Sequence, residues 1–142
     1  MRLVLDTATM VAAIRSDTGA SRRLLAAGLE RRLTLLVSVP LMIEYQAAMT
    51  RPADLAAARL SVEDLGVLLD AVAAVAEPVR LAFLWRPAVR DPDDDMVLEV
   101  AVNGQADAIV TFNVRDFGRV AERFGIAILP PGEALKRLED RT

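Results

Sequence analysis

Four acidic segments stand out in a chain that has no histidine and no cysteine. They are centred on Asp6, Glu44, the run 91–95 and Asp116. Without imidazole or thiol groups, the chain cannot build a zinc finger, a disulfide framework, a Ser-His-Asp triad or a cysteine nucleophile. Any catalysis must use carboxylates, hydroxyls, arginine, tyrosine or a metal bound through oxygen. The acidic segments are therefore the strongest candidates for chemistry.

Carboxylates that lie close together repel one another unless protons or cations neutralise them. Mg²⁺ and Mn²⁺ are the simplest neutralising ions, because they prefer carboxylate and water ligands and are usually completed by substrate phosphates. One or two such ions could lower the pKa of a bound water and stabilise charge on phosphoryl oxygens. A carboxylate site without histidine thus indicates phosphate chemistry.

Short apolar runs alternate with helical patterns along the whole chain. Strands are expected at about 3–5, 33–39, 79–84, 108–111 and 126–129. Helices are expected from about residue 9 and at about 19–32, 40–49, 61–76, 91–103, 115–124 and 131–138. Gly104 is expected to cap the fifth of these helices, and Ser61 to cap the fourth. The alternation predicts an α/β protein, with a parallel sheet covered by helices on both faces, in one domain over residues 1–142.

Three of the acidic positions follow predicted strands. Asp6 ends the first strand, and Glu44 lies one turn into the helix after the second. Asp116 follows the strand that ends at Thr111. The carboxyl ends of parallel strands meet at one edge of a sheet, where the ligands of such sheets gather. We therefore expect these carboxylates to converge at that edge.

Helical spacing selects residues within two of the segments. Glu44 is predicted to share an apolar stripe, rather than a solvated face, with Pro40, Ile43, Ala47 and Ala48. In the run 91–95, Asp94 heads a stripe that continues through Val97, Leu98 and Ala101.

Each carboxylate also has a purely structural interpretation. Asp6 could cap the following helix, and Asp116 could serve a turn. The run 91–95 could stabilise a helix start through the helix dipole, and Glu44 could form an ion pair with an arginine. The expected convergence of all four at one edge favours a site over four separate structural roles.

Five segments, in this order, resemble the PIN domain family. They are residues 3–7, 38–45, 90–96, 106–117 and 128–131. The resemblance covers nearly the whole chain and points to the branch of toxin components of prokaryotic toxin–antitoxin pairs, similar to VapC. It implies a three-layer α/β/α fold with a central parallel sheet and a Mg²⁺- or Mn²⁺-dependent endoribonuclease activity.

The resemblance also implies roles for individual residues. The catalytic and metal-binding positions are Asp6, Glu44, Asp94 and Asp116. Alternative ligands within the same acidic run are Asp91 and Asp95. Supporting residues, which orient a loop or hydrogen-bond a metal-bound water, are Thr7, Thr111 and Asn113. Candidates for contact with the RNA backbone are Arg15, Arg90 and Arg115.

The leading hypothesis is therefore a toxin that hydrolyses RNA phosphodiester bonds with a metal-activated water. Ala8 stands where the family usually has a polar residue, which motivates an alternative: a catalytically weak or inactive PIN domain that binds RNA or protein. A haloacid-dehalogenase enzyme would need an aspartate in place of Ala8, and a receiver domain would need a lysine near the last strands. The only lysine is Lys136, in the last predicted helix.

Composition sets expectations for partners and location. With a net charge of −3, the whole molecule does not attract RNA, so binding needs a local basic patch or bound cations. The longest uncharged run, 33–43, is too short to span a membrane, so we expect a soluble, cytoplasmic protein. Abundant Leu, Val and Ala in the helices predict a homodimer. The resemblance adds a cognate antitoxin protein as a partner.

Overall fold

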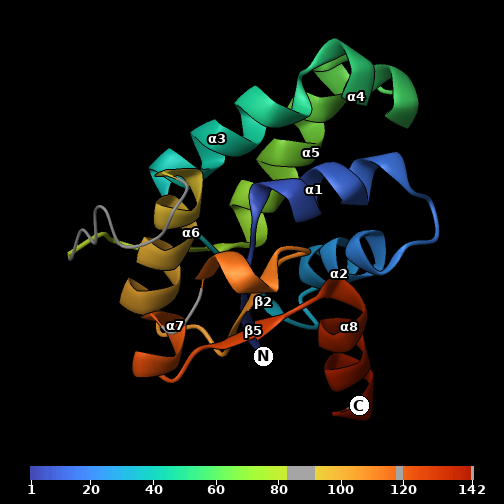
Figure 1. The fold of residues 1–142 in the computed structure, drawn as a ribbon. Helices are drawn as coiled ribbons and strands as arrows, with labels where there is room; N and C mark the ends of the chain where they lie inside the picture. Colours follow the sequence, from blue (N-terminus) through green and yellow to red (C-terminus); the bar gives the residue numbers. More distant parts are fainter. Residues whose placement is uncertain (83–91, 118–119, 142) are drawn as a thin grey trace.

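The computed structural model describes residues 1–82, 92–117 and 120–141 (Figure 1). Its centre is a parallel sheet with the strand order β3-β2-β1-β4-β5. The strands are β1 (Arg2–Leu5), β2 (Thr34–Val37), β3 (Glu77–Pro78), β4 (Ala108–Val110) and β5 (Ala127–Leu129). The residues of β4 and most of β1 are buried, as expected for strands that are covered on both faces.

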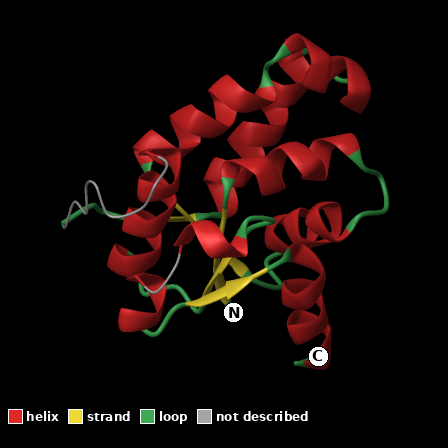
Figure 2. Ribbon diagram, in the orientation of Figure 1, coloured by secondary structure: helices red, strands yellow, loops and turns green. Residues whose placement is uncertain are grey.

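Helices cover the two faces of this sheet. They are α1 (Thr7–Arg15), α2 (Ala20–Leu29), α3 (Val39–Met49), α4 (Pro52–Ala58), α5 (Val62–Val75), α6 (Pro92–Asn103), the 3₁₀ helix η1 (Val114–Phe117), α7 (Val120–Arg123) and α8 (Pro131–Asp140). In Figure 1, α6 and α7 lie on one side of the sheet, and α1, α2 and α8 lie on the other. Figure 2 shows the strands between these two groups of helices. The predicted three-layer α/β/α fold is confirmed.

The strand order creates a switch point at the centre of the sheet. From β1 the chain builds outward to β2 and β3, then crosses back to add β4 and β5 on the other side of β1. Leu5 pairs with Val110, and the Asp6 backbone N–H donates to the Val110 carbonyl at 3.0 Å. The loops after β1 and β4 therefore leave the sheet side by side. Ligands of α/β sheets bind at such switch points.

The predicted strand at 79–84 is wrong in its described part, 79–82. The strand lies earlier, at β3, and pairs with β2 through Leu36 and Val37. The last bond of this ladder joins the Val79 N–H to the Val37 carbonyl at 2.7 Å. Beyond it, Ser38 caps α3 with its side chain, so β2 has no further residue to pair. Residues 83 and 84 lie outside the described residues.

Gly104 directly follows α6, as predicted, and its N–H donates to the Val100 carbonyl at 2.8 Å, but Gly104 does not adopt the left-handed conformation expected of a capping glycine. The left-handed residue after α6 is Gln105, with φ 53°. Gly104 is required by space instead, because a Cβ there would lie 2.8 Å from the Val100 carbonyl oxygen and 2.8 Å from a methyl carbon of Val79.

Two further segments differ from the expected helices. In place of a single helix at 115–124, the structure has η1 and α7, with residues 118 and 119 outside the described part of the chain. Phe117 at the end of η1 is completely buried, so packing rather than helical periodicity fixes this segment. Helix α4 was not predicted, because its seven residues are too few to show a clear period.

The other expected helices form close to their predicted ends. Ser61 caps α5 as predicted, in a reciprocal capping box with Asp64. Buried apolar side chains from the strands and most helices form one cluster. In the described part of the chain, no helix has the length and apolarity needed to cross a membrane.

Candidate active site

A cleft of about 360 Å³ lies where the chain leaves β1 and β4. The four predicted carboxylates that line this cleft are Asp6, Glu44, Asp94 and Asp116. They come from the end of β1, from α3, from α6 and from η1. The other residues that line it are Thr7, Ala8, Val11, Ala48, Arg51, Asp54, Val97 and Asn113. The fold thus brings four distant acidic positions to one hollow, which we call the acidic cleft.

Asp6 has a structural role and a free oxygen. It is only 5% exposed and is the N-cap of α1. Its Oδ1 accepts hydrogen bonds from the Thr9 backbone N–H at 2.8 Å and from the Thr9 hydroxyl at 2.6 Å. Its Oδ2 accepts no hydrogen bond from any residue that the structure describes. The cap therefore fixes one carboxylate oxygen and leaves the other for a ligand.

Tyr45 ties α3 to the end of β1. It is buried, and its hydroxyl donates a hydrogen bond to the Leu5 carbonyl. Burial raises the pKa of Tyr45 well above its usual value, and the nearby charge of Asp6 raises this pKa further. The hydroxyl thus remains a donor, and it holds the helix that carries Glu44 against the residue preceding Asp6.

The structure corrects the argument that selected Glu44. The predicted stripe is not buried, because Ile43 is 62% exposed and Ala47 is also exposed. The buried residues of α3 are Leu41, Tyr45, Ala48 and Met49. Since α3 packs through that face, Glu44 lies at its margin, where it is half-buried and lines the acidic cleft.

The acidic run at the start of α6 contributes Asp94 to the cleft. Asp94 is half-buried, and Val97, one turn later, lines the same cleft. Asp95 is buried and does not line the cleft. Asp91 and the side chain of Asp93 lie outside the described residues.

A short, hydrogen-bonded turn after β4 presents the last acidic position. Thr111 is completely buried, and its hydroxyl oxygen accepts from the Asn113 backbone N–H at 3.0 Å. The Asp116 backbone N–H donates to the Asn113 carbonyl at 3.0 Å. These bonds fix the turn from which Asn113 and Asp116 reach the cleft.

Thr7 carries a buried hydroxyl that has no hydrogen-bond partner in the described part of the chain. Thr7 is the first residue of α1 and lines the acidic cleft. A buried polar group without a partner costs about 1 to 3 kcal/mol. An oxygen-rich ligand in the cleft could remove that cost.

Sequence reasoning missed Asp54, which is buried and lines the cleft. Its Oδ1 accepts from Arg15 Nη1 at 2.8 Å, so this ion pair joins α4 to α1. The signal was present, because Pro52 and Asp54 are typical of the first turn of a helix. Arg51, which precedes this helix, is exposed and lines the cleft.

The three arginines expected to contact RNA have different surroundings. Arg15 holds the ion pair with Asp54 described above, at one margin of the cleft. Arg115 is exposed but does not line the cleft. Arg90 lies outside the described residues.

The donors of the cleft match the chemistry of a hard divalent cation. Among residues 1–82, 92–117 and 120–141, no three acidic side chains form a group that could hold a metal ion alone. Mg²⁺, however, commonly binds to one or two carboxylates and is completed by waters and substrate phosphates. Oxygen donors line the cleft, together with the unsatisfied hydroxyl of Thr7. These donors fit such an ion.

Comparison with known proteins supports the same conclusion. A family model for the PIN domain matches residues 2–115. The match includes Asp6, Glu44 and Asp94 and ends one residue before Asp116. A comparison with curated proteins gave no match. PIN domains are generally nucleases that use divalent metal ions. With this match and a parallel three-layer fold, the chain belongs to the PIN domain family.

Proposed function

We propose that the protein is a Mg²⁺- or Mn²⁺-dependent endoribonuclease that hydrolyses RNA phosphodiester bonds in the acidic cleft. The observation that carries this proposal is the convergence of Asp6, Glu44, Asp94 and Asp116. The proposal extends to a cytoplasmic toxin with a cognate antitoxin as its partner. That part rests on the resemblance of the sequence to the toxin branch of the family.

The four carboxylates would hold the ion or ions, with Asp6 offering its free Oδ2. A bound divalent cation supplies an activated water and neutralises charge on the phosphoryl oxygens. Tyr45 keeps Asp6 and Glu44 in register by fixing α3 to β1. The side chains of Thr7 and Asn113 can donate hydrogen bonds to phosphate oxygens at the cleft wall.

Arg51 is the basic side chain in the lining of this cleft. It is exposed, and a guanidinium can hold a phosphate through two parallel hydrogen bonds. The carboxylates repel the RNA backbone, whereas Arg51 and bound cations attract it. Entry of a phosphate into the cleft should therefore require the metal.

Cleavage of a mixed RNA pool tests the proposal. Asp6→Asn keeps an oxygen that can cap α1 and removes the charge, so it separates catalysis from folding. We expect Mn²⁺-dependent cleavage by the wild type, and none by Asp6→Asn or Asp94→Asn. Asp140→Asn, at the exposed end of α8, is the matched control and should cleave normally. Equal cleavage by all four proteins would overturn the proposal.

The alternative function remains a PIN domain that binds RNA or protein with little or no catalysis. The observation that favours it is Ala8, which adds only a methyl group to the cleft lining. Under this alternative, the purified protein binds RNA. It does not cleave RNA above the level of Asp6→Asn at any Mg²⁺ or Mn²⁺ concentration.

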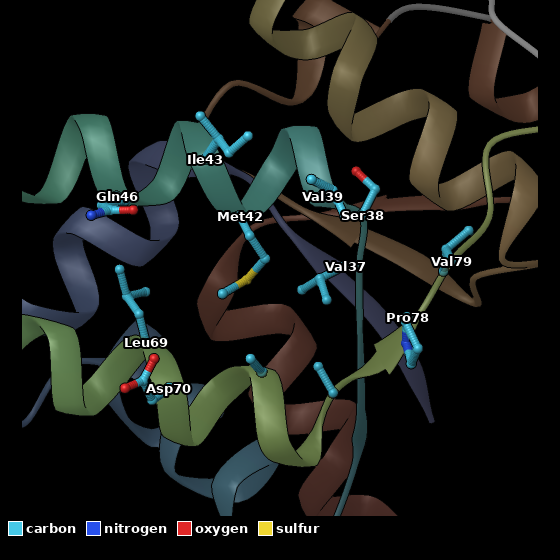
Figure 3. A pocket seen from close by; sticks show the side chains of 12 residues that line it. Val37, Ser38, Val39, Met42, Ile43, Gln46, Leu69, Asp70, Pro78 and Val79 are labelled. Atoms are coloured by element: carbon cyan, nitrogen blue, oxygen red, sulfur yellow. The ribbon is translucent and has the colours of Figure 1, made fainter.

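A second surface supports the proposal that the protein is a homodimer. An apolar groove of about 370 Å³ lies between α3, α5 and β3, and we call it the α3–α5 groove (Figure 3). Met42 extends into this groove from α3 (Figure 3). Two other apolar residues of its lining are largely exposed, Val39 at 74% and Ile43 at 62%. Exposed apolar patches of this kind are typical of protein interfaces.

The charges at its ends favour a second copy of the chain as the occupant. Asp70 is the charged residue of the lining and lies at one end, with Val79 at the other (Figure 3). Exposed Arg80 directly follows Val79. A two-fold axis across the groove would bring Asp70 of each copy toward Arg80 of the other, as an isologous interface allows. Light scattering that gives the mass of a monomer would contradict this part of the proposal.

A further inference from the structure

A smaller hollow of about 260 Å³ lies next to the acidic cleft. We call it the α2–α8 pocket, because the first turns of these two helices form much of its wall. The residues that line it are Ala12, Ser16, Gly19, Ala20, Ser21, Phe112, Pro131 and Gly132. None of these residues is charged, in contrast to the acidic cleft.

Phe112 gives this pocket an exposed aromatic surface. Its side chain is 55% exposed, although it directly follows the completely buried Thr111. The hydrogen bond between the Asn113 N–H and the Thr111 hydroxyl fixes the turn on which it lies. Phe112 lines the pocket and Asn113 lines the cleft, so this one turn separates the two hollows. An aromatic ring held in this way offers a stacking surface for a nucleobase.

The starts of α2 and α8 bring backbone donors to the pocket. Their N-caps, Gly19 and Pro130, provide no side-chain hydrogen bond. The first bond of α2 runs from the Arg23 N–H to the Gly19 carbonyl, so the N–H groups of Ala20 and Ser21 have no partner within the helix. Free N–H groups at a helix start attract phosphate.

Ser21 supplies an independent indication of a ligand. It is only 4% exposed and lines the pocket. Within the part of the chain that the structure describes, its hydroxyl makes no hydrogen bond. Among the residues that the structure describes, Thr7 alone has a fully buried side-chain oxygen without a partner, so the Ser21 hydroxyl is open to the pocket and can donate there to an oxygen acceptor.

We propose that the α2–α8 pocket binds one nucleotide of a single-stranded RNA whose neighbouring phosphodiester bond lies in the acidic cleft. The base stacks on Phe112, and a phosphate accepts hydrogen bonds from the start of α2 and from Ser21. Ala8 lines the cleft and Ala12 lines the pocket, one helical turn and about 6 Å apart along α1. The proposal rests on the proposed function, since it assigns the cleft to RNA cleavage.

The pocket holds its nucleotide without a metal, because it carries no acidic side chain. Fluorescence anisotropy with a labelled single-stranded RNA hexamer of mixed sequence, in EDTA, isolates this contribution from the cleft. Phe112→Ala should raise Kd about 10-fold, and Phe112→Leu should do the same, because a base loses its stacking partner. Phe112→Trp should bind as the wild type does. The matched control is Phe124→Ala, an exposed aromatic residue outside the pocket lining, which should leave Kd unchanged.

A titration with adenosine 5′-monophosphate, followed by amide NMR, provides a second readout. The amide signals of Ala20, Ser21 and Gly132 should shift in the wild type, and Ser21→Ala should weaken the response. A wild-type protein that does not bind the hexamer in EDTA would overturn the proposal. Equal Kd values for Phe112→Ala and the wild type would also overturn it.

The same variants separate this proposal from the nuclease assignment. If Phe112→Ala loses hexamer binding but the wild type cleaves no RNA in Mn²⁺, the pocket is supported and the proposed function fails. If the wild type cleaves RNA and Phe112→Ala cleaves it with the same KM and kcat, the nuclease is supported and the pocket proposal fails.

Discussion

The acidic cleft and the α3–α5 groove have almost the same volume, about 360 and 370 Å³, yet their linings differ completely. Helix α3 contributes to both. Glu44 and Ala48 face the cleft, whereas Met42, Ile43 and Gln46 line the groove. Size therefore says little about the role of either hollow. The chemistry of the lining, set by the face of one helix, distinguishes the proposed site for cations and phosphate from the proposed surface for another copy of the chain.

The acidic cleft and the α3–α5 groove also differ in the interactions that would stabilise them. The carboxylates of the cleft repel one another and any phosphate, so a bound cation should stabilise their convergence. Complete burial of each exposed apolar side chain at the groove would contribute about 1.5 to 3 kcal/mol to the free energy of association. Salt and chelators should therefore affect the cleft strongly and the groove weakly.

Substitutions at three consecutive residues of α3 can disturb the cleft, the groove and the core separately. Glu44→Gln should have the largest effect, because it removes a charge from the acidic cleft and leaves the groove intact. We expect RNA cleavage to fall by more than about 100-fold, since even residues that only orient metal ligands commonly contribute 10- to 100-fold. The mass from light scattering should not change. Cleavage at the wild-type rate would show that Glu44 has no role in catalysis.

Ile43→Glu should have the opposite pattern. A charge in the α3–α5 groove would have to be buried on association, so the mass should fall to that of one chain. Cleavage per chain should stay within about two-fold of the wild type, since the side chain does not line the cleft. A variant that still has the mass of two chains would show that another surface forms the dimer.

Tyr45→Phe tests the third face of α3, the one that packs in the core. This substitution removes the hydroxyl that donates to the Leu5 carbonyl. The free energy of unfolding should fall by about 1 to 3 kcal/mol. The corresponding decrease in Tm is about 3 to 10 °C, measurable by circular dichroism. Cleavage should decrease several-fold through kcat, because Asp6 and Glu44 lose their fixed spacing. An unchanged Tm would mean that the hydrogen bond contributes nothing.

The smallest effect is expected at the capping box of α5, far from the chemistry of either hollow. The hydrogen bond from the Ser61 backbone N–H lowers the pKa of Asp64. A carboxyl group whose folded-state pKa is lowered stabilises the fold above its unfolded pKa and loses that contribution as the pH falls through the folded pKa. The wild type should therefore melt slightly above Asp64→Ala at neutral pH, and the difference should shrink as the pH falls below about 4, the usual pKa of an aspartate. A difference that is constant with pH would contradict the assignment.

The sequence predicted the fold well wherever a local signal decides the structure. The apolar run before Asp6, the cap at Ser61 and the proline at the start of α3 all act within a few residues. The strand predicted at 79–84 was misplaced because its extent depends on where β2 ends, more than 40 residues earlier. Gly104 was predicted at the correct end of α6 but for the wrong reason, since a glycine is required there by the space beside Val79 rather than by a backbone angle.

The site shows the same division. Parallel-sheet geometry was enough to predict that Asp6 and Asp116 approach one another, because both follow adjacent strands. Asp54 could not be predicted from periodicity, because its helix is short and its partner, Arg15, lies on a different element. The α2–α8 pocket could not be predicted, since it needs two helix starts that are more than 100 residues apart to meet beside Phe112.

The most direct test of a cation-dependent site in the acidic cleft is the Tm in increasing Mn²⁺, measured for the wild type, Asp94→Asn and the control Asp140→Asn. Saturating Mn²⁺ should raise the Tm of the wild type and of Asp140→Asn by about 5 to 10 °C, because an ion that binds only the folded state stabilises it. Asp94→Asn should show little or no increase. An equal increase in all three proteins, or none in the wild type, would contradict the assignment of these carboxylates to a metal-dependent nuclease site.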